Sequence, residues 1–182
     1  MSQRPPYPRA RKSDVQDDYH GTMVPDPYRW LEEPDSEETH AWVAAQNALT
    51  RGELDAIPAR QRLEEHLRKL WDFPRATPPR QRGARLFYQL NEGLQNQPVL
   101  YRRDSLHGEP VVVVDPNELS QDGTVALINY APSSDGSLLA YTLASSGSDW
   151  QEIHILDVEN GETYEEVIRW VKFTTIAWKE DN

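Results

Sequence analysis

Residues 125–136 read VALINYAPSSDG, and residues 171–182 read VKFTTIAWKEDN. The two stretches align at an offset of 46 residues, from 125 to 171. The matched pairs are Val125 with Val171, Ala131 with Ala177, and Asp135-Gly136 with Asp181-Asn182. A repeat of roughly 40–50 residues that carries four strands has the length of a β-propeller blade. The alignment predicts such a repeat with hairpin turns at 135–136 and 181–182, and chance similarity between two β segments is the alternative.

Short runs rich in β-branched and aromatic residues follow one another from Arg85 onward, with turn residues between them. The expected strands are residues 86–90, 98–102, 110–115, 124–130, 137–143, 151–157 and 167–178. No helical stretch is long enough to form a crossover between parallel strands, so the strands should be antiparallel. We predict antiparallel four-stranded units over residues 85–178.

The region before residue 73 has a different pattern. Residues 1–34 are rich in proline and charge and are expected to form an extended arm. A helix should begin after Pro34, with Asp35 or Ser36 as N-cap, Asp35 and Glu38 at capping-box spacing, and Gly52 ending or kinking it.

A second helix should follow Pro58. It carries an amphipathic stripe of Leu63, Leu67, Leu70 and Trp71. Because two such helices have little apolar surface to share, the stripe is expected to need a partner surface.

Composition excludes several classes of function. The chain has 182 residues and a net charge of −11, from 19 basic and 30 acidic residues, which argues against binding to nucleic acid or an anionic membrane. It contains no cysteine, so a disulfide scaffold and cysteine-ligated metal sites are ruled out. There is no apolar run of membrane-spanning length and no apolar segment near Met1 that could act as a secretory signal. We therefore expect a cytoplasmic protein that needs no cofactor.

The serines and histidines form no recognisable catalytic motif. No serine has glycine at both flanking positions, as a Gly-x-Ser-x-Gly nucleophile elbow requires. The five histidines show no metal-binding spacing and are interpreted as structural or solvent-exposed. We therefore assign no catalytic residue and no metal ligand to this chain.

Several segments, in order and spacing, resemble the start of the prolyl oligopeptidase family of serine peptidases. They begin at Asp18 (DYHG), Val24 (VPDPYRWLE), Ala41 (AWVAAQN), Asn91 (NEGLQNQPVLY), Asp115 (DPNELS), Asp122 (DGTVAL) and Ser146 (SGSDW). The sister group that cuts after basic residues shares the Asp-Pro-Tyr-Arg-Trp-Leu segment. The Gly-Leu-Gln-Asn-Gln run favours the prolyl type.

The resemblance implies a mixed fold with a short α-helical N-terminal segment followed by all-β antiparallel blades. Residues 1–72 would be the arm and helices that pack on a C-terminal α/β-hydrolase domain, and residues 73–182 would be the first blades of a seven-bladed β-propeller. The chain would then be the truncated N-terminal part of an endopeptidase that cleaves short peptides after proline, with the propeller as a substrate-size filter. The hydrolase domain and its Ser-His-Asp triad are absent from these 182 residues, so the chain alone should be inactive.

The same resemblance suggests two substrate-side residues. Phe173 would reach from the propeller towards the substrate pocket, or alternatively fill the space between blades. Asp149 would bias the charge of the cavity near the hydrolase domain, or alternatively cap backbone amides in its own turn. The competing hypothesis for the whole chain is a stand-alone, propeller-like module that binds other proteins.

Overall fold

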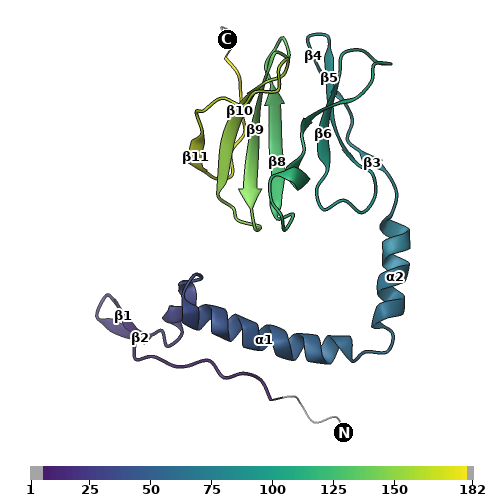
Figure 1. Cartoon of the computed structure of the whole chain (residues 1–182). Helices are drawn as coiled ribbons and strands as arrows, with labels where there is room; N and C mark the ends of the chain where they lie inside the picture. The colour runs from purple at the N-terminus through teal and green to yellow at the C-terminus, as the bar shows by residue number, and fades with distance from the viewer. Residues whose placement is uncertain (1–5, 180–182) are drawn as a thin grey trace. The chain divides into compact units, whose positions relative to one another are not determined.

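A computed structural model describes residues 6–179 of the chain. The molecule divides into two compact units, Met1–His66 and Leu67–Asn182 (Figure 1). The first unit contains a two-stranded hairpin and helices, and the second contains two antiparallel sheets. The predicted fold class, helices followed by antiparallel blades, is confirmed.

The N-terminal arm contains a hairpin that the sequence analysis missed. Strands β1 (Gln16–Tyr19) and β2 (Thr22–Pro25) pair antiparallel around a turn at His20 and Gly21. Both turn residues have positive φ, 56° and 88°, as a type I′ hairpin turn requires, and the Asp18 carboxylate accepts a hydrogen bond from the Gly21 amide at 2.6 Å. The hairpin was not predicted within the extended arm, because turn geometry rather than apolar alternation specifies it.

The 3-10 helix η1 (Arg29–Glu32) leads into helix α1 (Glu37–Asp55). Ser36 is the N-cap, and its hydroxyl accepts a hydrogen bond from the Thr39 amide at 3.2 Å. The proposed capping box of Asp35 and Glu38 is wrong, because the Glu38 carboxylate instead accepts two hydrogen bonds from Arg11, at 2.6 and 2.9 Å. The helix also continues through Gly52 and therefore does not end at that residue.

Helix α2 (Arg60–Trp71) forms where it was predicted, after Pro58. Its apolar stripe of Leu63, Leu67, Leu70 and Trp71 is more than half exposed at each position. The stripe is therefore largely uncovered within the part of the chain that the structure describes.

The first sheet has five strands rather than four. They are β3 (Arg75–Ala76), β4 (Arg80–Arg82), β5 (Arg85–Asn91), β6 (Val99–Arg103) and β7 (Val111–Val114). Both β3 and β4 pair with β5, at Asn91 and at Phe87 respectively, so together they form one interrupted edge. Pro78 and Pro79 stand between them and supply no amide hydrogen to a ladder. The prediction that strands begin only at Arg85 is corrected to residue 75 for this reason.

The 3-10 helix η2 (Pro116–Glu118) precedes a second sheet of four strands, which was predicted. The strands are β8 (Val125–Pro132), β9 (Leu138–Ser145), β10 (Gln151–Asp157) and β11 (Ile168–Val171), in the order β11-β10-β9-β8. The last strand is shorter than the expected 167–178, and the backbone takes positive φ at Phe173, just beyond its end. The hairpin turn expected at 181–182 lies outside the described residues.

The two sheets of the second unit enclose its core. Phe87, Leu100 and Val114 belong to the first sheet. Leu127, Tyr130, Leu139, Tyr141 and Leu156 belong to the second, and Val158 follows its third strand. Burying each such side chain contributes about 1.5–3 kcal/mol, so inter-sheet packing is the main attraction that holds the unit together.

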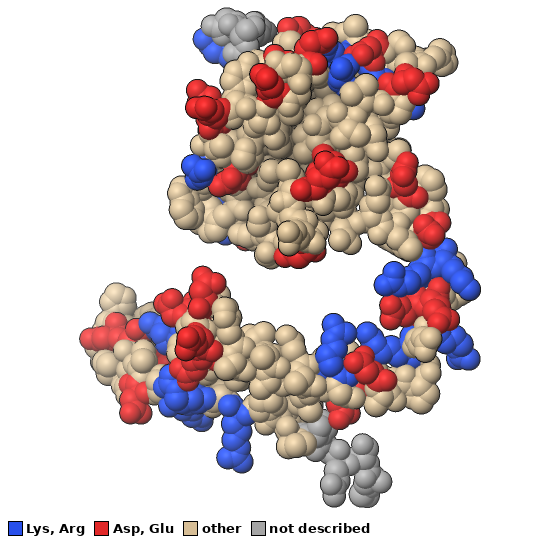
Figure 2. All heavy atoms as spheres, viewed as in Figure 1, with Lys and Arg blue, Asp and Glu red and all other residues tan. Residues whose placement is uncertain are grey.

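Both units carry charged side chains of both signs on their surfaces. Figure 2 shows acidic side chains scattered over the visible face of the sheet unit, and basic and acidic side chains intermixed along α2. In the described part of the chain, neither helix combines the length and the apolar character needed to span a membrane.

Candidate functional site

The loop between β9 and β10 presents Asp149 and Trp150 at one end of the second sheet. Ser146 and Gly147 have positive φ, 53° and 73°, and the Ser148 amide closes the turn on the Ser145 carbonyl at 2.9 Å. The Ser148 hydroxyl then accepts a hydrogen bond from the Trp150 amide at 3.1 Å. These local bonds fix the direction in which Asp149 and Trp150 leave the sheet.

Lys172, just after β11, joins the two predicted substrate-side residues. Its ammonium lies 3.1 Å from an Asp149 carboxylate oxygen and 5.0 Å from the centre of the Phe173 ring. The same ammonium lies 5.3 Å from the centre of the Trp150 ring. The structure thus brings Asp149 and Phe173 together around one cation, although they are far apart in the sequence.

The surroundings of Phe173 and Asp149 bear on whether each has a structural role instead of a substrate-side role. Phe173 is 80% exposed and has a φ of 49°, so its ring does not fill a space between the two described sheets. Asp149 pairs with Lys172, while the hydroxyl of Ser148 caps the neighbouring amide. The substrate-side roles of Phe173 and Asp149 remain predictions.

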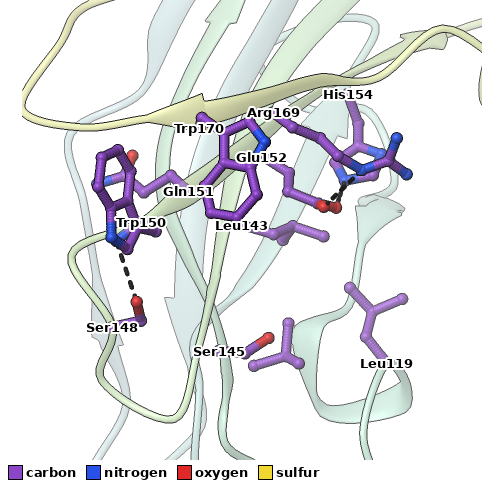
Figure 3. A pocket seen from close by; sticks show the side chains of 11 residues that line it. Leu119, Leu143, Ser145, Ser148, Trp150, Gln151, Glu152, His154, Arg169 and Trp170 are labelled. Atoms are coloured by element: carbon purple, nitrogen blue, oxygen red, sulfur yellow. Dashed lines mark hydrogen bonds and ion pairs between the residues drawn. The ribbon is translucent and has the colours of Figure 1, made fainter. Parts of the chain in front are cut away.

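A cavity of about 460 Å³ lies beside this loop (Figure 3). Trp150 and Trp170 form one wall, with ring centres 5.8 Å apart and ring planes at 83°. The complete lining is Leu119, Val125, Leu143, Ser145, Ser148, Trp150, Gln151, Glu152, His154, Arg169 and Trp170. All four strands of the second sheet or the loops beside them contribute to the cavity.

Glu152 is the acidic group of the cavity, and its charge is matched by neighbours. One carboxylate oxygen accepts a hydrogen bond from Arg169 Nε at 3.0 Å, and the other lies 3.4 Å from His154 Nε2. The His154 ring stacks on Tyr141, with centres 5.5 Å apart and planes at 25°. The polar groups of the cavity pair with one another. This arrangement is better suited to binding a ligand than to catalysis.

Ser137 and Ser148 both lie in turns. Ser137 follows a turn, where the Asp135 carboxylate accepts hydrogen bonds from its amide and hydroxyl, and Ser148 closes another turn. Residues 6–179 contain no group of three or more side chains that could hold a metal ion.

Sequence reasoning missed Lys172, Trp170, Glu152 and Arg169. Trp170 and Lys172 flank Val171 in the aligned repeat region, which was the available signal. Their grouping depends on the register shift between β10 and β11 near Gln151 and Ile153. A shift of this kind re-aims side chains and leaves no mark in an alternating pattern.

The two packed antiparallel sheets, the second with four strands in sequential order, define the class of the sheet unit as blades of a β-propeller. Residues 7–182 match the family model described as prolyl oligopeptidase, N-terminal beta-propeller domain. The chain therefore belongs to the prolyl oligopeptidase family.

Relatives in that family are similar over nearly the whole chain. A prolyl endopeptidase from Elizabethkingia meningoseptica is 39% identical over 175 residues, which cover 96% of this chain and 25% of the relative. Prolyl oligopeptidase A from Amanita bisporigera is 36% identical and is matched over 26% of its length. The chain thus spans about a quarter of the length of the curated relatives that it matches.

Solved structures give the same result. One chain from a structural study of two prolyl endopeptidases has a TM-score of 0.78 and 36% identity, over 90% of this chain and 24% of that one. Prolyl oligopeptidase B from Galerina marginata, bound to a 35mer hydrolysis and macrocyclization substrate, has a TM-score of 0.76 and 31% identity, over 97% of this chain and 28% of that one.

Proposed function

We propose that this chain supplies the N-terminal segment and first propeller blades of a serine-type endopeptidase that cleaves short peptides after proline. The match of residues 7–182 to the N-terminal propeller domain of the prolyl oligopeptidase family carries this proposal. Relatives named prolyl endopeptidase, matched over 96% of this chain, support proline as the specificity.

In this proposal the chemistry is performed by a C-terminal α/β-hydrolase domain, and the propeller admits short peptides and keeps longer ones out. Residues 1–72 would be the segment that packs on the hydrolase domain, and residues 73–182 the blades. The exposed stripe on α2 supports a packing role, because apolar side chains at Leu67, Leu70 and Trp71 gain free energy when a partner covers them. Location in the cytoplasm is part of the same proposal.

Phe173 and Asp149 would face the substrate. Phe173 offers a largely exposed ring, and Lys172 holds the Asp149 carboxylate close to it. An exposed aromatic ring beside an ion pair can contact the apolar side chains and the charged terminus of a short peptide.

A chimera tests the function. Residues 1–182 replace the matched segment of the Elizabethkingia meningoseptica enzyme, and kcat/KM is measured on a short chromogenic peptide with one proline. The chimera should cleave after proline, and the isolated 182-residue chain should not. A folded chimera without activity would contradict the proposal and would favour a stand-alone binding module.

A further inference from the structure

The side chain of Arg75 joins the end of α2 to the first sheet. Arg75 is the first residue of β3, and its Nη1 donates a hydrogen bond of 2.7 Å to the carbonyl of Trp71, the last residue of α2. Its Nη2 donates to the Gly93 carbonyl at 2.8 Å and to Asn91 Oδ1 at 3.2 Å, in the loop after β5 and at the end of that strand. One guanidinium therefore binds groups on both sides of the connection between helix and sheet.

The end of α2 needs a group of this kind. The last carbonyls of a helix have no partner within the helix, and a cation beside them also suits the negative end of the helix dipole. The guanidinium carbon of Arg75 lies 4.8 Å from the centre of the Trp71 ring and 5.2 Å from the centre of the Phe73 ring, within the range of cation–π attraction. Only a planar guanidinium has donors that point to two sides at once, so a lysine ammonium could not replace it fully.

The loop that receives Arg75 is held together by its own hydrogen bonds. Asn91 is buried; its Oδ1 also accepts from the Gly93 amide at 2.9 Å, and its Nδ2 donates to the Gln95 carbonyl at 2.9 Å. The Gln95 side chain in turn accepts from the Glu92 amide at 2.8 Å. A Cβ on Gly93 would overlap the carboxylate of Asp72, so the loop lies directly against the residue that follows α2.

The other end of this loop is anchored to η2. The Gln97 amide donates to Asn117 Oδ1 at 3.0 Å, and Asn117 Nδ2 donates to the Gln97 carbonyl at 3.0 Å. Residues 93–97 are the Gly-Leu-Gln-Asn-Gln run of the sequence. The run is thus a rigid acceptor for Arg75, fixed at both of its ends.

We propose that Arg75 is a positioning residue for peptide hydrolysis, because it holds the last turn of α2 in one direction on the first sheet. The inference rests on the proposed function, in which α2 packs on the hydrolase domain and the blades exclude long substrates. Without the guanidinium, the end of α2 and β3 would be joined by the backbone of residues 72–74 and by weaker contacts. The blades would then be held less firmly over the hydrolase domain, and long substrates would enter more easily.

Spin labels test the local part of the proposal in the 182-residue chain. The chain has no cysteine, so labels attach only at introduced positions, K69C in the last turn of α2 and V112C in β7, both exposed in the parent. Double electron–electron resonance should give a narrow distance distribution for the parent and a broader one for R75Q, with R75K between them. R82Q is the matched control and should match the parent, because Arg82 is exposed and donates to the carbonyl of its neighbour Gln81. An unchanged distribution in R75Q would overturn the proposal.

The Elizabethkingia chimera tests the positioning role. R75Q should lose the preference for a proline bond in a short peptide over the same bond in a full-length unfolded protein, through a higher kcat/KM on the protein. An unchanged preference, or an equal loss of activity on both substrates, would overturn this role, since general damage to the fold lowers both rates together. If circular dichroism shows that R75Q is unfolded, R75K decides by the same two readouts. An inactive parent chimera contradicts the proposed function, whereas the spin-label distances still decide whether Arg75 fixes the helix end.

Discussion

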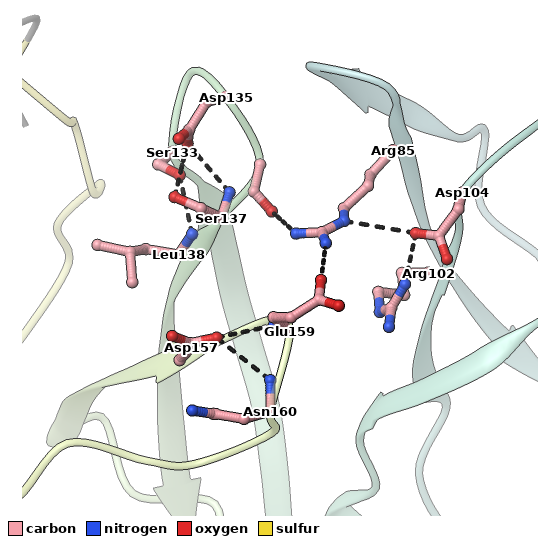
Figure 4. Close-up of polar contacts among 11 residues, drawn as sticks. Arg85, Arg102, Asp104, Ser133, Asp135, Ser137, Leu138, Asp157, Glu159 and Asn160 are labelled. Carbon is pink, nitrogen blue, oxygen red and sulfur yellow. Dashed lines mark hydrogen bonds and ion pairs between the residues drawn. The ribbon is translucent and has the colours of Figure 1, made fainter.

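The guanidinium of Arg85 donates a hydrogen bond of 2.9 Å to the backbone carbonyl of Gly136 and so joins the first sheet to the second (Figure 4). The same guanidinium also pairs with Glu159 and lies 3.4 Å from Asp104. Gly136 is buried, whereas the two carboxylates are largely exposed. The carbonyl contact is therefore expected to contribute more to stability than the two ion pairs.

R85A should lower the free energy of unfolding by about 1–3 kcal/mol, because it leaves a buried carbonyl without its donor. The matched control is R82A, since Arg82 is exposed and donates to the carbonyl of its neighbour Gln81. R82A should stay within about 0.5 kcal/mol of the parent. Urea denaturation of the three proteins measures the difference, and equal stability of R85A and R82A would show that Arg85 does not hold the sheets together.

G136A should destabilise the protein more than G147A. Both glycines have positive φ, 76° and 73°, so alanine costs roughly 1–2 kcal/mol at either position. A Cβ on residue 136 would also lie 2.7 Å from the Arg82 carbonyl oxygen, whereas a Cβ on residue 147 meets nothing within 4 Å. We expect an additional loss of about 1–3 kcal/mol for G136A from this overlap. If thermal or urea denaturation shows equal stability for the two variants, the turn at Gly136 is further from Arg82 than the structure places it.

The free energy of unfolding should fall in acid, in part because the Asp135 carboxylate becomes protonated. Hydrogen bonds from the Ser137 amide and from the hydroxyls of Ser133 and Ser137 lower the pKa of Asp135 from 3.8 to about 2. Because the folded pKa is the lower one, the contribution is present above the ordinary pKa and is lost as the pH falls from about 4 to about 2.

D135N does not titrate at this position, so its urea midpoint should change less than that of the parent between those pH values. Some dependence should remain, because the pKa values of Asp104 and Asp122 are also lowered, chiefly by hydrogen bonds from Arg102 and Thr124. Identical pH profiles for D135N and the parent would refute this role of Asp135.

The apolar stripe on α2 should bind a hydrophobic dye in the isolated chain. L63Q/L67Q/L70Q should reduce dye fluorescence and self-association, since each exposed leucine forgoes about 1.5–3 kcal/mol that burial would provide. The control R62Q/H66Q/K69Q changes three other exposed positions of α2 and should behave like the parent. Equal dye binding by both triple variants would place the accessible apolar surface elsewhere.

Sequence reasoning succeeded where local chemistry determines the structure. Ser36 before an acidic first turn predicted the start of α1, and the strands from Val125 to Asp157 follow from apolar runs with glycine turns between them. The absence of a nucleophile elbow could also be read directly from the serines.

Sequence reasoning failed where contacts between residues far apart in the chain determine the structure. The interrupted edge of the first sheet depends on the pairing of Arg75 and Arg80 with β5, on either side of two prolines. At the candidate site, the grouping of Asp149 with Lys172 and the outward direction of Trp170 require a register shift and positive φ. No periodicity in the sequence encodes these features.

We propose above that these residues form the part of a proline-specific peptidase that selects short substrates. The most direct measurement compares kcat/KM of the Elizabethkingia chimera for one proline bond, placed in a short peptide and in a full-length unfolded protein. We expect cleavage after proline in the short peptide and a rate at least about tenfold lower on the protein, a difference of about 1.4 kcal/mol in activation free energy. Equal rates on both substrates by a folded chimera, or no cleavage of either, would contradict it.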